Sequence, residues 1–272
     1  MRIARPQHGA HSGARTVRSA CGLVVLWLVS WLVMGPAAPT AAAAAAGPAD
    51  VGTTPGASGG DTELDRYLAG LHTLRTQFTQ TVTDPHGKLT ESGSGSLLVE
   101  RPGRFRWDYQ PHEQGQPHQS GQPHEQGGSA GGGASDGDTG QLLVADGRNL
   151  WFYDRELAQV TVKPLSAALS ATPIMLLSGS LSDLRTSFQV LADGRQDGLS
   201  WVVVRPQTAQ ADFSEARLGF RGQELARMIV HDMLGQSVQL DFSHSQRNGP
   251  IDPRAFQFQV PPGVDVIGTP QH

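Results

Sequence analysis

Two pairs of residues near the end of the chain have the side chains of acids, bases or metal ligands: His231 with Asp232, and Asp241 with His244. Neighbouring residues of a β-strand point to opposite faces, so His231 and Asp232 cannot hold one ion together without help. We therefore interpret all four as polar positions on a half-solvated sheet. The sequence has no HExxH, GxSxG, Walker A or dinucleotide-binding glycine motif. We expect no enzymatic activity, no metal and no cofactor.

A different chemistry is indicated by the segment Arg101–Tyr109 (RPGRFRWDY). In a strand, Phe105, Trp107 and Tyr109 share one face, which is then strongly aromatic. The segment Leu150–Tyr153 (LWFY) is apolar on both faces, so it must be covered on both sides, by protein or by something else. An ordinary core explains either segment alone. Whether these faces form an ordinary core or a binding surface therefore depends on which other elements can cover them.

One amphipathic helix is predicted at the start of the core. Its apolar side chains follow the helical spacing i, i+3, i+4, i+7: Leu64, Tyr67, Leu68, Leu71 and Leu74. Thr62 and Asp65 have the spacing of a capping box, in which two side chains satisfy the first backbone amides of a helix. We expect a helix of about three turns with one apolar stripe.

Short β-rich runs with period two follow, separated by turn residues. The predicted strands are Phe78–Asp84, Ser94–Glu100, Arg104–Tyr109, Gln141–Ala145, Asn149–Asp154, Gln159–Lys163, Ser187–Ala192, Leu199–Arg205, Ala216–Arg221, Glu224–His231, Ser237–Ser243 and Phe256–Val260. Consecutive strands with short connections predict a large antiparallel sheet that is strongly curled or nearly closed. The fold class is therefore mainly β with some α (α+β), with about 11 strands.

Few elements are available to cover this sheet. Besides the first helix, only Leu165–Leu177 and a short turn near Asp252–Ala255 are predicted to be helical. A curled sheet of this size has a long concave face. If its cover is loose, the concavity can hold a lipid in place of a packed core.

The N-terminus has the plan of a signal peptide. Arginines precede an apolar run, Ala20–Met34, and an alanine tract ends near Ala46. The run of about 15 residues is shorter than the roughly 20 that a membrane-spanning helix needs. We therefore predict a signal peptide over 1–46, a flexible leader over 47–60 and an exported mature protein without cysteine, since the single Cys21 is removed.

The charge of the mature chain excludes one class of partner. Of the 21 basic residues, four lie in the signal peptide, which has no acidic residue, so 17 remain against 25 acidic ones. The formal net charge of −4 thus becomes −8. An acidic chain without a basic cluster is a poor partner for a polyanion, and we expect no binding to nucleic acid.

Residues 110–140 form a low-complexity insertion rich in Gln, Pro, His and Gly. Its hexapeptide copies place His112, His118 and His124 six residues apart. Histidine-rich tracts can bind metal, but imidazoles on an unstructured tract chelate weakly, and we favour a solvated loop. The rest of 61–268 is long enough for one compact domain.

Several segments resemble the periplasmic outer-membrane lipoprotein carrier family LolA. They are L-x-x-Y-L-x-x-L-x-x-L-R-x-x-F-x-Q-x-V-x-D from Leu64 to Asp84, G-x-L-x-V-x-R-P-x-x-F-x-W from Gly95 to Trp107, and V-A-D-G-x-x-L-W-F-Y-D from Val144 to Asp154. The segments Gln159–Val162 and Thr172–Leu177 also match. After Ser182 the resemblance rests on the strand pattern and the closing F-Q-F-x-x-P-P-G-V.

The resemblance implies an incomplete, strongly curled antiparallel β-barrel whose concave face receives lipoprotein acyl chains beneath a lid of about three short helices. Arg101 matches the arginine that hydrogen-bonds lid carbonyls and latches the empty form. The lid residues implied are Ile174, Met175 and Leu177. Phe105 and Trp107 match cavity-wall aromatics, to which we add Leu98, Trp151, Tyr153, Leu68 and Leu71 as predicted cavity residues.

The implied partners are acylated lipoproteins, an inner-membrane lipoprotein-releasing ABC transporter and an outer-membrane lipoprotein receptor. The protein itself is expected to be a monomer in the periplasm. Two other functions stay open at this point. One is a carrier of another amphiphile, such as a glycolipid or an isoprenoid, because an aromatic wall does not distinguish these tails. The other is a metal-binding protein that uses the histidine tract.

Overall fold

The computed structural model describes residues 61–112, 139–168, 173–207 and 211–271. Twelve strands form a single sheet in the order β12-β6-β5-β4-β3-β2-β1-β11-β10-β9-β8-β7. Every neighbouring pair is antiparallel except β12 and β6, which are parallel. The strands are β1 (Thr73–Thr83), β2 (Leu89–Glu100), β3 (Arg104–Pro111), β4 (Gln141–Asp146), β5 (Asn149–Asp154), β6 (Gln159–Pro164), β7 (Phe188–Gln196), β8 (Leu199–Pro206), β9 (Phe213–Arg221), β10 (Glu224–Asp232), β11 (Ser237–Arg247) and β12 (Asp265–Ile267).

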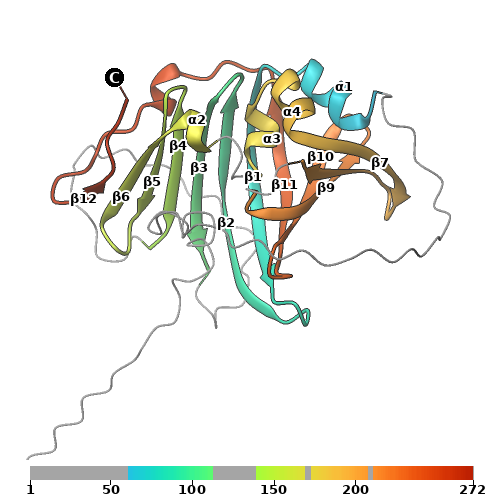
Figure 1. Ribbon diagram of the computed structural model, residues 1–272, viewed down its shortest axis with the longest axis horizontal. Helices are drawn as coiled ribbons and strands as arrows, with labels where there is room; N and C mark the ends of the chain where they lie inside the picture. The colour runs from blue at the N-terminus through green and yellow to red at the C-terminus, as the bar shows by residue number, and fades with distance from the viewer. Residues whose placement is uncertain (1–60, 113–138, 169–172, 208–210, 272) are drawn as a thin grey trace, which may run out of the picture. The chain divides into compact units, whose positions relative to one another are not determined.

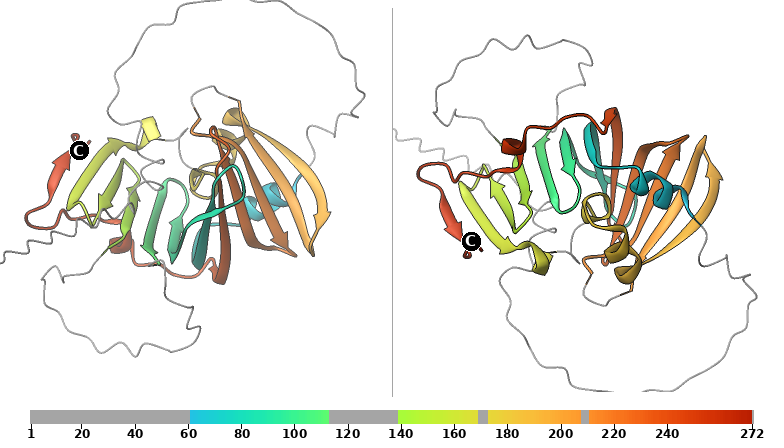
Figure 2. Two further views of the ribbon diagram at one scale, coloured as in Figure 1. Left: turned by 90° about the horizontal axis from the view of Figure 1, so that it is seen from below. Right: turned by 90° about the horizontal axis from the view of Figure 1, so that it is seen from above.

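The sheet is curled but not closed, because β12 and β7 form its two ends. The strands stand side by side in Figure 1, and the two views of Figure 2, which look along them, show the sheet as an arc with the helices on the concave side and the C-terminal segment crossing the convex side. This confirms the predicted class, a curled and incomplete barrel with few helices. It also gives the sheet an inner face, toward the helices, and an outer face.

The strand predictions hold for eleven of the twelve segments. The exception is Phe256–Val260, which is not a strand: Pro253–Phe256 forms a 3-10 helix, η3, and the last strand is β12, further along the chain. The reason is local. Asp252 accepts a hydrogen bond from the amide of Arg254, which caps a helical turn, and the prolines at 261 and 262 have no amide to donate to a ladder.

The first helix, α1 (Glu63–Ala69), is shorter than predicted. The capping box is present, with Thr62 Oγ1 accepting from the amide of Asp65, and with the Asp65 carboxylate accepting from the amide of Thr62. The helix ends at Gly70, so Leu71 lies beyond it and Leu74 belongs to β1. A glycine loses much backbone freedom in a helix and favours its end, which the spacing of the leucines does not reveal.

The predicted helical interruption at Leu165–Leu177 is two short helices, α2 (Leu165–Ala168) and α3 (Met175–Ser178), with residues 169–172 between them outside the described set. A further helix, α4 (Leu181–Ser187), follows at once and was not predicted. Short helices lack the repeated apolar spacing that identifies longer ones, and their stability comes from packing.

Other predictions fall on residues that the structure does not describe. The signal peptide over 1–46, the leader over 47–60 and most of the insertion lie outside the described residues. At the borders of the insertion, Gln110 and Pro111 still belong to β3. Among the described helices, none has the length and apolar character required to cross a bilayer.

Candidate functional site

A column of aromatic rings lies on the inner face of the sheet. Phe78 of β1 stacks on Trp107 of β3 with ring centroids 3.9 Å apart, and the ring of Tyr109 lies 6.4 Å from that of Phe78 at an angle of 8°. Phe78 and Tyr109 are buried, whereas Trp107 is half-buried. The period-two pattern of β3 therefore does place its aromatic side chains together.

Two glycines of β2 make room for this column. A Cβ atom at Gly93 would overlap with the ring of Tyr109, and one at Gly95 would overlap with the ring of Phe78 and the carbonyl oxygen of Asp108. Because these positions carry no side chain, the rings lie flat across the strand between β1 and β3. The sequence signal was available in the pattern G-S-G-S of β2.

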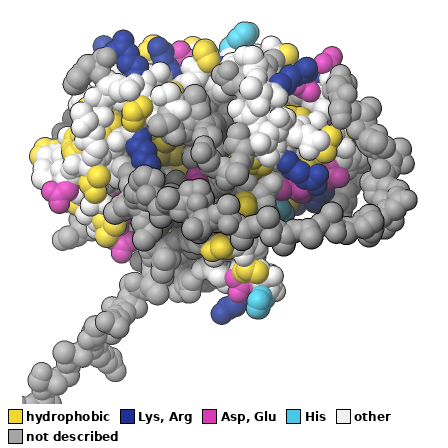
Figure 3. Space-filling model, viewed as in Figure 1, with side chains coloured by type: hydrophobic (Ala, Val, Ile, Leu, Met, Phe, Trp, Pro, Cys, Tyr) yellow, Lys and Arg dark blue, Asp and Glu magenta, His cyan; other side chains and the backbone are white. Residues whose placement is uncertain are grey.

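Several predicted cavity and lid residues are buried on the helix side of the sheet. Phe105 is fully buried, and Leu68 and Leu71 are 1% and 2% exposed. Of the lid residues, Ile174 is 6% exposed and Leu177 is fully buried, while the side chain of Met175 lies outside the described set. The helices thus pack their apolar side chains inward. In the space-filling view of the concave side, further hydrophobic side chains are visible over the region of β4–β6 (Figure 3).

Three predicted cavity residues lie on the opposite face, so this part of the prediction is wrong. Directly opposed residues of antiparallel strands share a face. Phe105 opposes Ala145, and Ala145 opposes Leu150, so the next residue, Trp151, points away from Phe105. The same argument places Tyr153 and Leu98 on the outer face.

The C-terminal segment covers these outer aromatics. The ring of Phe258 lies 5.4 Å from that of Trp151 and 6.1 Å from that of Tyr153. The indole Nε1 of Trp151 donates to the Asp146 carboxylate over 2.9 Å. The apolar character of both faces of β5 is therefore explained by a protein segment on the outside and by the concavity on the inside.

Arg101 lies at the tip of the hairpin between β2 and β3 and contacts both the segment after α3 and the end of α1. Its Nε and Nη2 both donate to the carbonyl oxygen of Gly179, at 3.1 and 2.7 Å, just after α3. Its Nη1 donates to the carbonyls of Leu68 and Leu71 at the end of α1. Burial lowers the pKa of Arg101, but an arginine pKa is so high that the group stays charged.

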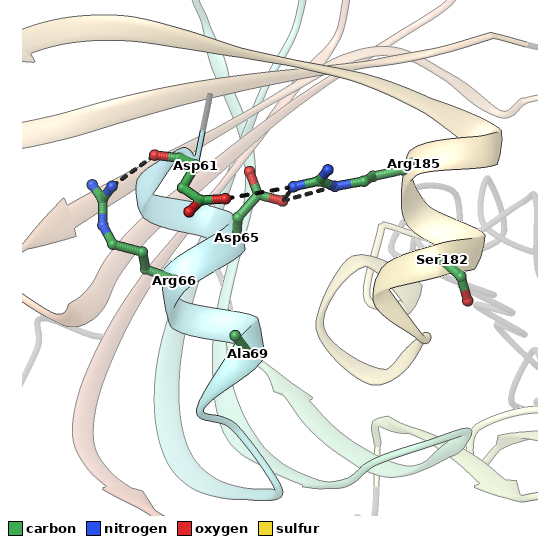
Figure 4. A pocket seen from close by; sticks show the side chains of 6 residues that line it. All are labelled: Asp61, Asp65, Arg66, Ala69, Ser182 and Arg185. Carbon is green, nitrogen blue, oxygen red and sulfur yellow. Dashed lines mark hydrogen bonds and ion pairs between the residues drawn. The ribbon is translucent and has the colours of Figure 1, made fainter. Parts of the chain in front are cut away.

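Two further contacts hold the segment α3–α4. The amide of Gly103 donates to the carbonyl of Ser178 over 2.9 Å. Arg185 of α4 reaches Asp65 of α1, with an N to O distance of 3.0 Å (Figure 4). Burial raises the pKa of Asp65, but hydrogen bonds from Thr62 and Arg185 outweigh it, so the net pKa lies below the usual value.

In contrast to α3–α4, the end of α1 is attached directly to the sheet. Arg247 of β11 donates to the carbonyl of Tyr67 over 3.1 Å and lies over its ring, 4.5 Å from the centroid. Asn248 donates to the carbonyl of Gly70 and accepts from the amide of His72. Burial raises the pKa of Tyr67 to about 12, so its phenol stays neutral. Arg101 and Asp65 thus connect the segment α3–α4 with α1, which is itself attached to the sheet.

The inner face also carries charged groups that the sequence analysis missed. Glu91 of β2 accepts a hydrogen bond of 2.7 Å from the Tyr109 hydroxyl. Burial lowers the pKa of Lys163 and raises that of Asp212, and the opposite charge of each opposes the other's shift. The two charges influence each other electrostatically although Lys163 belongs to β6 and Asp212 directly precedes β9, a strand far from β6 in the sheet order.

The possible acid, base or metal residues do not assemble. Across the described ranges, no three residues of the types His, Cys, Asp and Glu come together as a metal site would require. Asp241 instead accepts from Arg227 over 2.6 Å, and His244 is exposed on β11.

Comparison with known proteins identifies the family. The model for "Outer membrane lipoprotein carrier protein LolA" matches residues 69–115 and 135–259. The outer-membrane lipoprotein carrier protein of Nitrosospira multiformis is 35% identical over 206 residues, 75% of this chain and 86% of that protein. Its namesake in Chromobacterium violaceum is 35% identical over 229 residues, 84% of this chain and 95% of that one.

Among solved structures, a LolA superfamily protein from Nitrosomonas europaea has a TM-score of 0.40 and 11% identity, covering 72% of this chain and 94% of that one. The family match covers both α3 and the β2–β3 hairpin, and it leaves out residues 116–134, within the insertion. This chain belongs to the LolA family of outer-membrane lipoprotein carrier proteins.

Proposed function

We propose that this protein is a periplasmic carrier that binds lipoprotein acyl chains on its inner face and transfers the lipoprotein from an inner-membrane ABC transporter to an outer-membrane receptor. The family and the names of the relatives support a carrier of lipoproteins. The observation that supports the proposal most is the contact set of Arg101, which ties the segment α3–α4 to the β2–β3 hairpin on the side of the sheet that carries the aromatic rings.

The energetics require such a lid. Each acyl methylene group exposed to water costs about 0.8 kcal/mol, so a lipoprotein needs a cover while it crosses an aqueous space. Complete burial of several chains would contribute more than roughly 20 kcal/mol, and release would be slow. A useful carrier must therefore bind its cargo less tightly than burial alone allows.

Opening of the lid costs free energy, and this cost offsets part of the gain from burying the acyl chains. Displacing α3–α4 breaks the hydrogen bonds from Arg101 to the Gly179 carbonyl, and charge-assisted bonds of this kind contribute about 1.5–3 kcal/mol each. The closed state is thus favoured when the inner face is empty. Because the sequence has no nucleotide-binding motif, the energy for loading must come from the transporter.

The test is extraction of a lipoprotein from membranes. Inner-membrane vesicles that contain the transporter and a labelled lipoprotein are incubated with ATP and the mature protein, and the vesicles are then sedimented. We expect the lipoprotein to appear in the supernatant bound to the carrier, and an unacylated version of the same lipoprotein not to bind. Retention of the lipoprotein in the pellet, or equal binding of the unacylated version, would contradict the proposal.

A further inference from the structure

The guanidinium of Arg101 rests on the turn that joins α1 to β1. We call residues 68–73 the α1–β1 corner. Nη1 of Arg101 donates to the carbonyls of Leu68 and Leu71, and the backbone amide of Arg101 donates to the carbonyl of His72 over 2.9 Å. Nε and Nη2 are then left to reach the carbonyl of Gly179. The position of the α1–β1 corner therefore determines the direction in which this side chain points.

The α1–β1 corner is held by one side chain that follows β11. The last carbonyls of a helix have no amide partner within the helix, and α1 ends at a glycine, which gives the backbone more freedom than other residues do. Nδ2 of Asn248 donates to the Gly70 carbonyl over 2.8 Å, and its Oδ1 accepts from the His72 amide over 2.8 Å. Leu71, whose carbonyl accepts from Arg101, lies between these two residues and is thereby fixed from both sides.

The bridge across the α1–β1 corner needs a side-chain amide. An asparagine carries a donor and an acceptor on one group, whereas an aspartate carries only acceptors and would face the Gly70 carbonyl with a negative charge. Asn248 has a φ of 58°, in the left-handed region that Asn adopts more readily than most residues. Its backbone amide donates to the Thr73 carbonyl over 2.8 Å, which ties it to β1. Asn248 is exposed, so its contacts with the α1–β1 corner, and not core packing, are its contribution to the structure.

Resting on the proposed function, we infer that Asn248 is a positioning residue for the Arg101 latch. By fixing the carbonyl of Leu71, it orients the guanidinium so that Nε and Nη2 meet the carbonyl of Gly179. Without this bridge the α1–β1 corner has more freedom, the hydrogen bonds to Gly179 form for a smaller part of the time, and the segment α3–α4 opens more easily. Arg247 still holds the end of α1, so the effect is smaller than that of removing Arg101 itself.

The variant Asn248→Gly tests this role. It removes the bridge and suits the left-handed backbone, so it adds no strain. The matched control is His244→Gly, because His244 is exposed on β11 and has a φ of 53°. Its ring is hydrogen-bonded to the neighbouring Ser243 and not to the α1–β1 corner. A difference between the two variants therefore reports the loss of the bridge and not the presence of a glycine at a positive φ.

Opening of the proposed lid is measured without cargo, by hydrogen exchange of the backbone amides of α3 and α4. We expect Asn248→Gly to accelerate this exchange about threefold or more, and His244→Gly to leave it unchanged. Arg101→Leu should also accelerate it. Adding Asn248→Gly to Arg101→Leu should then change the rate by less than about 1.5-fold, because both residues act through the same hydrogen bonds. Equal acceleration with and without Arg101, as a purely structural role would give, or no acceleration at all, overturns the inference.

The consequence for transport is measured separately. Binding is followed by displacement of a fluorescent apolar probe with a synthetic diacylated lipopeptide, and transfer by the movement of labelled lipoprotein from the carrier to the receptor. Asn248→Gly should bind the lipopeptide at least as well as the natural sequence and transfer lipoprotein about threefold more slowly. Transfer at the natural rate overturns the role of Asn248 in transport. If the exchange results hold but the natural sequence neither binds the lipopeptide nor carries lipoprotein, the positioning role stands and the proposed function fails.

Discussion

At the scale of single residues, Arg101 differs from the other arginines of its hairpin in what it binds. Arg104 pairs with Glu100 at the surface, whereas Arg101 donates only to backbone carbonyls of the lid and of the end of α1. The Gly179 carbonyl is part of the backbone directly after α3, so we expect its hydrogen bonds from Arg101 to break if α3–α4 moves away. This makes Arg101 the residue whose loss should affect opening most.

We predict that Arg101→Leu binds lipoprotein as well as or more tightly than the natural sequence but transfers it onward more slowly. The reason is that the closed, empty state loses hydrogen bonds of about 1.5–3 kcal/mol each, so less energy favours release. Transfer is measured as the rate at which labelled lipoprotein moves from the purified complex to the receptor. Arg104→Leu, the control, should transfer at the natural rate. Unimpaired transfer by Arg101→Leu would refute the latch.

A pH dependence follows from Asp65. Its pKa is lowered in the folded protein, so its carboxylate contributes stability above the unfolded pKa of about 4 and loses that contribution as pH falls through the folded value. We expect Asp65→Asn to lower the free energy of unfolding by roughly 1–3 kcal/mol at pH 7, and the difference from the natural sequence to shrink below about pH 4. Urea unfolding at several pH values measures this.

The control for this prediction is Asp61→Asn, because Asp61 is 81% exposed and lies 3.8 Å from the same arginine. It should change stability little at any pH. A difference between Asp65→Asn and the natural sequence that stays constant down to pH 2 would show that the charge of Asp65 has no part in it.

Some residues of this site could be predicted from the sequence, and others could not. Phe105 and Trp107 were assigned to a common face, because every second residue of a strand points to the same side of the sheet. Trp151, Tyr153 and Leu98 were assigned to the same cavity wrongly. Which residues of neighbouring strands share a face depends on the strand register, and a single sequence does not reveal the register. Glu91 was missed because an acidic residue in a strand looks like a solvated position.

At the scale of elements, the helices of the proposed lid differ in how they are attached. α1 is tied to β11 through Arg247 and Asn248, while α3–α4 is held by the hairpin and by Arg185. We therefore expect α3–α4 to move and α1 to stay with the sheet during loading. The groove between α1 and α4, of about 260 Å³, is where we expect the two parts to separate (Figure 4).

A cross-link across this groove should block loading. Ala69 of α1 and Ser182 of α4 both line it, and the predicted mature chain has no cysteine of its own. We predict that Ala69→Cys/Ser182→Cys, joined by a short reducible cross-linker, takes up no lipopeptide and recovers on reduction. Uptake is measured by displacement of the apolar probe. The two single-cysteine variants treated alike should load normally, and normal loading of the cross-linked protein would contradict motion of α4 away from α1.

The elements themselves were largely predictable. Eleven strands follow from alternation and turn residues, and the capping box located the start of α1. The end of α1 at Gly70, the helix α4 and the loss of a strand at Phe256–Val260 were not foreseen. In each case a local backbone preference or tertiary packing, which side-chain periodicity does not report, determined the outcome.

At the scale of the whole molecule, we expect the insertion to be separable from the sheet. β3 and β4 pair up to Tyr109 and Gln141, so their ends already face each other as in a hairpin. We predict that deletion of residues 113–138, which leaves Gln110, Pro111, His112, Thr139 and Gly140 between these two paired residues, keeps the melting temperature within about 2 °C. Thermal unfolding followed by circular dichroism measures it. A large loss of stability would show that the insertion contributes to the core.

The central claim is that acyl chains occupy the inner face of the sheet. The measurement that tests it most directly is photo-cross-linking with a lipoprotein whose acyl chains carry a diazirine, followed by mass spectrometry of the labelled carrier. The account predicts adducts on inner-face residues such as Trp107 and Phe78. Adducts concentrated on Trp151, Tyr153 and Phe258 of the outer face, or no adducts in a complex that does contain the lipoprotein, would contradict it.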